Sequence, residues 1–243
     1  MSALLEVEGI AKRFGGVTAV DHCSMQVGEG SITALIGPNG SGKTTLFNVV
    51  TGYLPADAGV VRFAGRRFDR PDPTRLYRSG LTRTFQQARV FAGLTLVENL
   101  VAAIHQSWRS LLRARVSASD RERAQEVLDQ FGIAHLGDRR AGELSFGQRK
   151  LLEFGAVLMG RPRLVLLDEP PSGVNPVMVE AMEGHVRRLH EEGLTFLIVE
   201  HDMNLVMRLC DPVIVLDHGA KIAEGHPDDV RSDPRVLDAY LGV

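Results

Sequence analysis

Residues 37–44, Gly-Pro-Asn-Gly-Ser-Gly-Lys-Thr, follow the pattern G-x-x-x-x-G-K-[ST] of a phosphate-binding loop. Glycines allow a tight loop whose backbone N–H groups point at phosphate oxygens, and a helix that starts there adds the positive end of its dipole. The lysine reaches the β- and γ-phosphates, and the following hydroxyl coordinates Mg²⁺. This predicts a nucleoside triphosphate site with Mg²⁺, made by Gly37, Pro38, Asn39, Gly40, Ser41, Gly42, Lys43, Thr44 and Thr45.

Two adjacent acids, Asp168 and Glu169, follow the apolar run 164–167 and form a second candidate group. If that run is a strand beside the phosphate-binding loop, Asp168 is placed to hold Mg²⁺, usually through water. Glu169 can then orient or deprotonate an attacking water. A kinase with the same loop passes phosphate to a bound hydroxyl and has less need of such a glutamate. The pair favours hydrolysis over phosphate transfer.

Five short apolar runs are expected to be the strands that position these residues. They span residues 4–10, 31–36, 164–167, 195–199 and 213–216. Several are apolar at every position, which is typical of parallel strands buried on both faces. The phosphate-binding loop leaves the run 31–36 and leads into a helix near Lys43. These patterns predict an α/β fold.

Capping patterns predict three of the helices between these strands. The first is capped by Thr95 with Glu98, the second by Ser119 with Glu122, and the third by Asn175 with Pro176. Gly132 is expected to end the second helix and Gly193 the third. We expect one domain, residues 1–243, with an α/β core lobe of residues 1–86 and 160–243 and a helical lobe of residues 87–159. In residues 94–104 the apolar positions follow helical spacing, which favours packing inside the helical lobe over contact with lipid.

The composition is that of an ordinary globular protein and excludes disordered, collagen-like and disulfide-stapled classes. The chain has 243 residues, 44% hydrophobic and 24% charged. Its apolar runs are strand-length, far short of the 20 or so residues that cross a bilayer. Residues 1–10 lack the basic start of a signal peptide. Two cysteines, Cys23 and Cys210, suit a reducing compartment, so we expect a cytoplasmic protein.

Charge is distributed unevenly along the chain. Residues 62–150 contain 17 basic and 9 acidic residues, whereas the whole chain has 28 basic and 30 acidic ones. The basic segment is a candidate docking surface, and codon use in a GC-rich genome equally explains the preponderance of arginine over lysine. A nucleic-acid patch usually mixes in exposed aromatic residues and makes the whole domain basic. We therefore expect no nucleic-acid partner.

The sequence Leu144-Ser-Phe-Gly-Gln148 lies shortly before Asp168, at the expected start of a helix. Here the chain resembles the ATP-binding cassette (ABC) family, whose signature L-S-G-G-Q precedes the acidic strand. The resemblance implies a RecA-like P-loop NTPase core with a helical subdomain. It also implies that two subunits hold two ATP molecules head to tail, so that the signature residues contact the γ-phosphate of the ATP on the opposite subunit. These residues are Ser145, Phe146, Gly147 and Gln148, with Phe146 in place of the commoner glycine.

The resemblance assigns roles to three further residues. Phe14 resembles the aromatic residue on which adenine stacks, and His201 the switch histidine that holds the γ-phosphate. Gln86 resembles the loop glutamine that contacts Mg²⁺ and water, and it is preferred to Gln87 because the family's glutamine directly follows a phenylalanine. Asn175 stands where the family has an aspartate. The resemblance thus implies a catalytic set of Glu169, His201 and Gln86 and a metal set of Thr44, Gln86 and Asp168.

Five segments are similar to the ATPases of branched-chain amino acid importers, and to the first of their two ATPase subunits. They are residues 14–20, 83–91, 94–99, 200–203 and 239–242. The resemblance implies a peripheral ATPase on the cytoplasmic face of the inner or plasma membrane, which energises solute import through separate permease subunits. Its other partners would be a second ABC ATPase subunit, identical or a paralogue, and indirectly a solute-binding protein. ATPases of urea, short amide and lipopolysaccharide transport look similar and stay open as alternatives.

Two further classes of protein are weaker alternatives. Soluble cassette ATPases that act on DNA insert a long coiled coil between the two nucleotide motifs, and only 125 residues separate Lys43 from Asp168 here. Cassette ATPases that act on ribosomes carry two cassettes in one chain, whereas this sequence contains one. A P-loop nucleotide kinase would lack the signature at Ser145 and the histidine at position 201.

Overall fold

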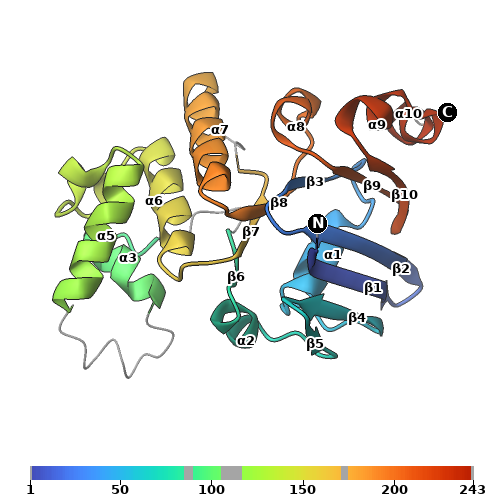
Figure 1. Ribbon diagram of the computed structural model, residues 1–243, viewed down its shortest axis with the longest axis horizontal. Coiled ribbons are helices and arrows are strands. Elements are labelled where there is room, and N and C mark those ends of the chain that lie inside the picture. The colour runs from blue at the N-terminus through green and yellow to red at the C-terminus, as the bar shows by residue number, and fades with distance from the viewer. Residues whose placement is uncertain (1, 85–89, 105–116, 171–174, 242–243) are drawn as a thin grey trace.

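Ten strands form two sheets in the computed structural model, which describes residues 2–84, 90–104, 117–170 and 175–241 (Figure 1). The smaller sheet is antiparallel, in the order β2-β1-β4-β5. Its strands are β1 (Ala3–Phe14), β2 (Val17–Gly28), β4 (Ala58–Phe63) and β5 (Arg66–Phe68). The strand expected at residues 4–10 is the first part of β1, which continues to Phe14.

The larger sheet has the order β10-β9-β3-β8-β7-β6. Its strands from β9 to β6 pair in parallel, and β10 pairs antiparallel with β9. The bounds are β3 (Ile32–Ile36), β6 (Leu81–Arg83), β7 (Leu164–Asp168), β8 (Thr195–Val199), β9 (Val213–Asp217) and β10 (Ala220–Gly225). The expected runs 31–36, 164–167, 195–199 and 213–216 are therefore confirmed as parallel strands. Two of them end one residue later, on an aspartate.

The apolar runs are continuous because both faces of the larger sheet are covered. In β3, Ala34 and Ile36 belong to one hydrophobic cluster and Leu35 belongs to another. The same alternation holds in β7 and β8, every residue of which is buried. One cluster joins the sheet to the helices α3, α5, α6 and α7, and the other joins it to α1 and the antiparallel sheet.

The helices fall into groups around the larger sheet. Figure 1 shows α3, α5 and α6 together on one side, α7 between them and α8, and α9 and α10 beside β10. Their bounds are α1 (Lys43–Val50), α2 (Pro73–Arg78), α3 (Leu96–Ile104), α5 (Ala118–Gln130), α6 (Phe146–Leu158), α7 (Pro176–Glu191), α8 (Met203–Leu209), α9 (Pro227–Ser232) and α10 (Pro234–Leu241). Two short 3₁₀ turns, Ala134–Leu136 and Ala141–Glu143, lie between α5 and α6.

Two of the three predicted helix starts are confirmed. At α3 the Thr95 hydroxyl accepts from the Glu98 N–H at 3.1 Å, and the Glu98 carboxylate accepts from the Thr95 N–H at 2.8 Å. At α7 the Asn175 side chain accepts from the N–H of Met178 at 2.9 Å. The stops also hold, because Gly132 and Gly193 follow the ends of α5 and α7 with positive φ angles of 69° and 96°.

The predicted start at Ser119 is wrong. Helix α5 begins two residues earlier, because the Ser117 hydroxyl accepts from the N–H of Asp120 at 3.0 Å and caps the helix. Ser119 lies inside the first turn, where its hydroxyl is 3.0 Å from that of Ser117. Both serines are suitable caps by type, and the chain uses the earlier one.

The amphipathic segment at residues 94–104 packs inside the helical region, as predicted. Val97, Leu100 and Val101 of α3 are buried in the cluster that continues through α5 and α6 to the sheet. The helical region and the sheet thus share one hydrophobic cluster. The division into lobes at residues 86/87 and 159/160 stays a prediction. The second boundary falls between α6 and β7, and the first lies outside the described residues.

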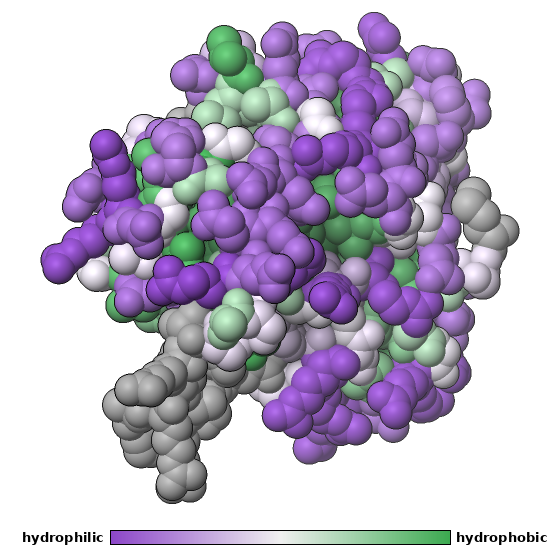
Figure 2. Space-filling model, turned by 60° about the vertical axis from the view of Figure 1, so that its left-hand side comes forward, coloured by the Kyte–Doolittle hydropathy of each residue, from purple (hydrophilic) through white to green (hydrophobic). Residues whose placement is uncertain are grey.

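The face shown in Figure 2 is mostly hydrophilic, with apolar side chains visible as smaller areas between polar ones. Among the described residues, no helix combines the length and the apolar character needed to traverse a bilayer.

Candidate nucleotide site

The candidate residues come together because three neighbouring parallel strands end at the same edge of the sheet. The phosphate-binding loop follows β3, the pair Asp168–Glu169 ends β7, and His201 follows β8. Strand β8 lies between the other two, and its last residue, Val199, is in register with both Leu35 and Asp168. Carboxyl ends of parallel strands are where open α/β sheets bind their ligands.

All three glycines of the phosphate-binding loop have positive φ angles, and at two of them a side chain would also have no room. Gly37 has a φ of 148° and Gly42 a φ of 98°. A Cβ at Gly37 would collide with the carbonyl oxygen of Leu216, and one at Gly42 with that of Ala19. The motif therefore requires glycine at these positions because the loop packs directly against neighbouring backbone.

Lys43 lies across the phosphate-binding loop. Its ammonium donates to the carbonyl oxygens of Gly37 at 2.8 Å and Pro38 at 2.9 Å. Burial lowers the pKa of Lys43, and the Glu169 carboxylate opposes this shift. A phosphate anion at the loop would provide the charged partner that the buried ammonium favours. Thr44 and Thr45 follow in the first turn of α1, and Thr44 is exposed.

Asp168 is buried and has a cationic partner that the sequence reasoning missed. The Arg83 guanidinium donates to Asp168 Oδ2 at 3.2 Å, and both side chains are 8% exposed. Burial raises the pKa of Asp168, which the charge of Arg83 opposes. In the sequence, Arg83 is only a charged residue three positions before Gln86. The sequence does not show that its strand, β6, lies beside β7, which ends at Asp168.

The residues predicted to hold Mg²⁺ have suitable chemistry. Thr44 supplies a hydroxyl and Asp168 a carboxylate, and Mg²⁺ prefers oxygen ligands and uses few of them from the protein when phosphates are present. Gln86, the third predicted ligand, lies outside the described residues, as does its alternative, Gln87. The donor set of the described residues therefore fits the ion.

Glu169 and His201 lie close to each other. The distance from Glu169 Oε1 to His201 Nδ1 is 3.7 Å, and the His201 side chain is 64% exposed. Glu169 has a φ of 46°, a rare conformation for a non-glycine residue. Its N–H donates to the carbonyl oxygen of Val199 at 3.0 Å. This bond ties the Glu169 backbone to the strand that precedes His201.

Glu200 is a second buried acid that the sequence reasoning missed. Its Oε2 accepts from the N–H groups of His201 at 2.8 Å and Asp202 at 3.0 Å, and the residue is 1% exposed. Burial raises the pKa of Glu200, and these two hydrogen bonds oppose the shift. Asp202 in turn caps α8. Glu200 thus fixes the backbone that carries His201.

Phe14 ends β1 and is 50% exposed, so it is not part of the hydrophobic core. The Lys12 ammonium lies 5.6 Å from the centroid of its ring and pairs with Asp57 at 2.8 Å. Asp57 also accepts from the N–H of Arg13 at 2.7 Å. An exposed ring beside a fixed cation can stack on a flat aromatic ligand.

The signature residues begin α6. The Ser145 hydroxyl accepts from the N–H of Gln148 at 3.3 Å, and the Gln148 side chain accepts from the N–H of Ser145 at 3.0 Å. Phe146 is exposed, and a Cβ at Gly147 would press on the Met178 side chain. Helix α6 packs in the cluster on one face of the larger sheet and α1 in the cluster on the other face. The structure therefore separates the signature helix from the helix of the phosphate-binding loop.

A parallel sheet that carries this loop and a carboxylate pair at its edge defines the class of P-loop nucleoside triphosphatases. The family model described as "ABC transporter" matches residues 20–172, and that described as "Branched-chain amino acid ATP-binding cassette transporter" matches residues 220–243. The chain belongs to the ABC transporter family, as an ATP-binding subunit that hydrolyses ATP.

Curated relatives match over almost their full length. A high-affinity branched-chain amino acid transport ATP-binding protein, BraF of Pseudomonas aeruginosa, is 37% identical, with 98% of each chain covered. A probable branched-chain amino acid transport ATP-binding protein, LivG of Methanocaldococcus jannaschii, is 38% identical, with 98% of this chain and 97% of the relative covered. A solved nucleotide-free ATP-binding cassette from an ABC transporter is 38% identical and superposes with a TM-score of 0.90 over all of both chains. The ADP conformation of such a cassette, 39% identical, gives the same TM-score and coverage.

Proposed function

We propose that this chain is the ATPase subunit of an importer for branched-chain amino acids and that it uses the site residues assigned above. One observation carries the site assignment: β3, β7 and β8 bring the phosphate-binding loop, Glu169 and His201 to one edge of the sheet. The solute is supported by the names of the relatives and by the family model that matches residues 220–243.

In this proposal the ATP is held at three points. Phe14 stacks on adenine, the loop N–H groups and Lys43 bind the phosphates, and Thr44, Gln86 and Asp168 hold Mg²⁺. The Mg²⁺ supplies charge neutralisation on the β- and γ-phosphate oxygens. The buried Lys43 ammonium exchanges its carbonyl partners for phosphate oxygens, which are stronger acceptors because they are charged.

The chemical step is attack of a water on the γ-phosphorus. Glu169 orients this water and accepts its proton, while the bond from the γ-phosphorus to the bridging oxygen breaks and ADP leaves. His201, with Gln86, holds the γ-phosphate and the water in line. The left-handed backbone of Glu169 and the bond from the His201 N–H to Glu200 fix the backbone that carries the two side chains.

A second ABC ATPase subunit, either a second copy or a paralogue, completes each site in this proposal. Helix α6 and helix α1 pack on opposite faces of the larger sheet, so the signature residues are turned to a different surface from the loop of their own chain. The start of α6 offers a helix N-terminus beside Ser145 and the exposed Phe146, which suits a phosphate presented by a partner.

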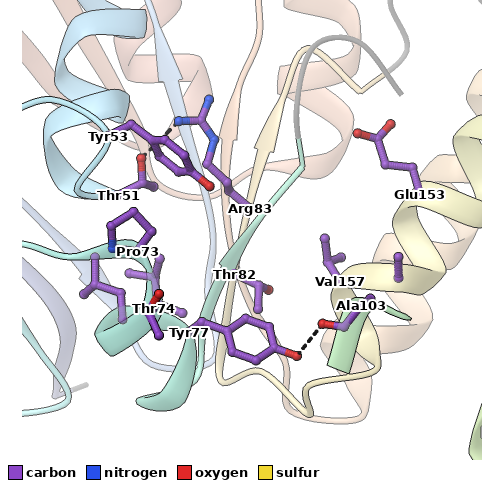
Figure 3. A pocket seen from close by; sticks show the side chains of 13 residues that line it. Thr51, Tyr53, Pro73, Thr74, Tyr77, Thr82, Arg83, Ala103, Glu153 and Val157 are labelled. Atoms are coloured by element: carbon purple, nitrogen blue, oxygen red, sulfur yellow. Dashed lines mark hydrogen bonds between the residues drawn. The ribbon is translucent and has the colours of Figure 1, made fainter. Parts of the chain in front are cut away.

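Separate permease subunits bind, in this proposal, at a pocket of about 340 Å³ between α2, β6 and the helices α3 and α6 (Figure 3). Tyr77 from α2 and Thr82 from β6 face Val157 of α6 across it. The Thr82 hydroxyl oxygen is buried without a hydrogen-bond partner among the described residues. The lining also includes the charged side chains of Arg83 and Glu153 (Figure 3), so a largely apolar segment with polar groups opposite these two fits it. Strand β6 leads directly to residues 85–89, which contain Gln86.

A basic hollow lies against the other side of α2 and supports a peripheral position on the cytoplasmic membrane face. It measures about 410 Å³ and is lined by Arg66, Arg67, Arg75 and Arg78. Helix α2 thus has the pocket on one side and four arginines on the other. A hollow lined by four arginines suits contact with anionic lipid headgroups, which attract basic residues at a membrane surface.

Co-purification tests this proposal. The tagged chain is purified from its native membranes in mild detergent, and we expect integral membrane proteins to accompany it. In the reconstituted complex, solute-binding protein loaded with leucine, isoleucine or valine should raise the rate of ATP hydrolysis, with empty binding protein as the control. Isolation as a free ATPase that DNA stimulates would contradict the proposal. Stimulation by urea or a short amide instead would replace only the solute.

A further inference from the structure

We propose that Arg83 is a positioning residue that joins the Asp168 carboxylate to the pocket of Figure 3, so that the pocket and the metal site act on each other through it. The inference rests on the proposed function in one respect, the assignment of Asp168 to Mg²⁺. It adds a residue to which neither the sequence nor the family resemblance gave a role.

On one side, Arg83 holds the carboxylate. The bond from its Nη2 to Asp168 Oδ2 at 3.2 Å pairs two side chains that are almost completely buried. A buried carboxylate keeps one orientation when a charged donor fixes one of its oxygens. Arg83 therefore sets how Asp168 is presented at the edge of the sheet.

Arg83 also forms hydrogen bonds to the helix that follows the phosphate-binding loop, α1. Its Nη1 donates to Asn48 Oδ1 at 2.7 Å and to Thr51 Oγ1 at 3.0 Å. Asn48 belongs to α1 and Thr51 caps the C-terminal end of that helix. One guanidinium thus connects the helix that starts at Lys43 with the strand that ends at Asp168.

On a third side, Arg83 forms part of the pocket wall. Its guanidinium carbon lies 5.3 Å from the ring centroid of Tyr53 and 4.6 Å from that of Phe47. Arg83, Tyr53 and Thr51 line the pocket, whereas Asp168 is not among the residues that line it. Figure 3 shows Tyr53 and Arg83 side by side on one wall. A side chain that enters the pocket meets Arg83 before any group of the nucleotide site.

The rigid shape of the guanidinium allows a change at the pocket to alter the bonds that Arg83 makes to Asp168 and α1. Arginine presents its donors in a rigid planar fork, so a rotation that suits an occupant of the pocket changes the bonds at the other end of the fork. A lysine has a single ammonium and cannot serve Asp168, Asn48 and Thr51 in the same geometry. The conservative change Arg83→Lys therefore keeps the charge and removes the connection.

The test measures the affinity of Mn²⁺, used in place of Mg²⁺, for the ADP complex of the full chain by electron paramagnetic resonance. We expect Arg83→Lys to weaken Mn²⁺ binding about tenfold, the lower end of the range for residues that orient a metal ligand. We expect Tyr53→Leu to weaken it less, and to add nothing in the Arg83→Lys background. Tyr77→Leu changes the same pocket at a residue that donates to the Ala103 carbonyl, and it should leave Mn²⁺ affinity unchanged.

Three outcomes separate the inference from its premise. Unchanged Mn²⁺ affinity in Arg83→Lys, with only a lower melting temperature, would make Arg83 a purely structural residue. If Tyr53→Leu lowers the Mn²⁺ affinity equally in the wild type and in the Arg83→Lys variant, Arg83 does not connect the pocket to the metal site. Unchanged affinity in Asp168→Asn would instead remove Asp168 from the metal site. Arg62→Lys, at the exposed pair with Glu8, controls for the substitution itself, and Arg83→Gln provides a second variant if Arg83→Lys fails to fold.

Discussion

Glu169 Oε1 lies 3.7 Å from His201 Nδ1, across the ends of the neighbouring strands β7 and β8. Neither side chain is held by sequence proximity, because 32 positions separate them. The N–H of Glu169 donates to Val199, and Glu200 accepts from the N–H of His201, so backbone contacts at the strand ends fix both residues. The backbone of both residues is therefore positioned by the fold, which is the kind of arrangement that preorganised catalysis requires.

The first prediction concerns Glu169→Gln. We expect ATP hydrolysis to fall at least 100-fold while ATP binding persists, because the amide keeps the shape of the carboxylate and cannot accept the proton of the attacking water. Size-exclusion chromatography with ATP should then show a stable dimer. Glu180→Gln, a change of the same kind on α7, serves as the control. Near-normal hydrolysis by the Glu169 variant would remove Glu169 from its assigned role.

Much of this site could be predicted because the signals are local. The pattern at residues 37–44 needs only its own glycines and lysine, and the continuous apolar runs before Gly37 and Asp168 identify buried parallel strands. The caps at Thr95 and Asn175 act on N–H groups three residues away. Such interactions stay within one turn of chain.

What the sequence could not show depends on long-range pairing. Arg83 and Asp168 meet only because β6 lies beside β7 in the sheet, a neighbour relation that no local pattern encodes. Glu200 looks like a surface acid in the sequence, whereas the fold buries it completely. The choice of Ser117 over Ser119 as a cap is likewise made by the path of the chain, because both residues suit the position by type.

The second prediction concerns Phe14. Because the ring is half exposed, Phe14→Ala should change the melting temperature little and weaken ATP binding about three- to tenfold, the value of one aromatic stacking contact. Phe14→Trp should restore binding. Val17→Ala, at an exposed apolar residue at the start of β2, is the matched control. Binding measured with a fluorescent ATP analogue decides the result, and unchanged affinity in Phe14→Ala would place adenine elsewhere.

The third prediction concerns the pH dependence of stability at Glu200. Burial raises its pKa, so between the unfolded and folded pKa values the native state binds more protons than the unfolded state. The contribution of Glu200 to the free energy of unfolding is therefore greatest below its unfolded pKa and falls as the pH rises towards its folded pKa. Glu200→Gln keeps an oxygen that can accept from His201 and Asp202, and it removes the buried charge. The free energy of unfolding of the wild type should decline relative to that of this variant from about pH 4.5 upward. A constant difference across pH 4–8, measured by urea denaturation, would contradict the prediction.

The last prediction tests whether each ATP site is built from two chains. Lys43→Ala removes the phosphate-binding lysine and Ser145→Ala the signature hydroxyl, so either variant alone should hydrolyse little ATP. In a mixed dimer, the Ser145→Ala subunit supplies an intact phosphate-binding loop and the Lys43→Ala subunit an intact signature. One of the two sites is then complete. Because mixing equal amounts makes half of the dimers mixed, about one quarter of the wild-type rate should return if the two sites act independently. Sites built within one chain would show no recovery, and neither would a pair that forms only with a paralogue. Recovery therefore establishes both the head-to-tail arrangement and the ability of this chain to pair with itself.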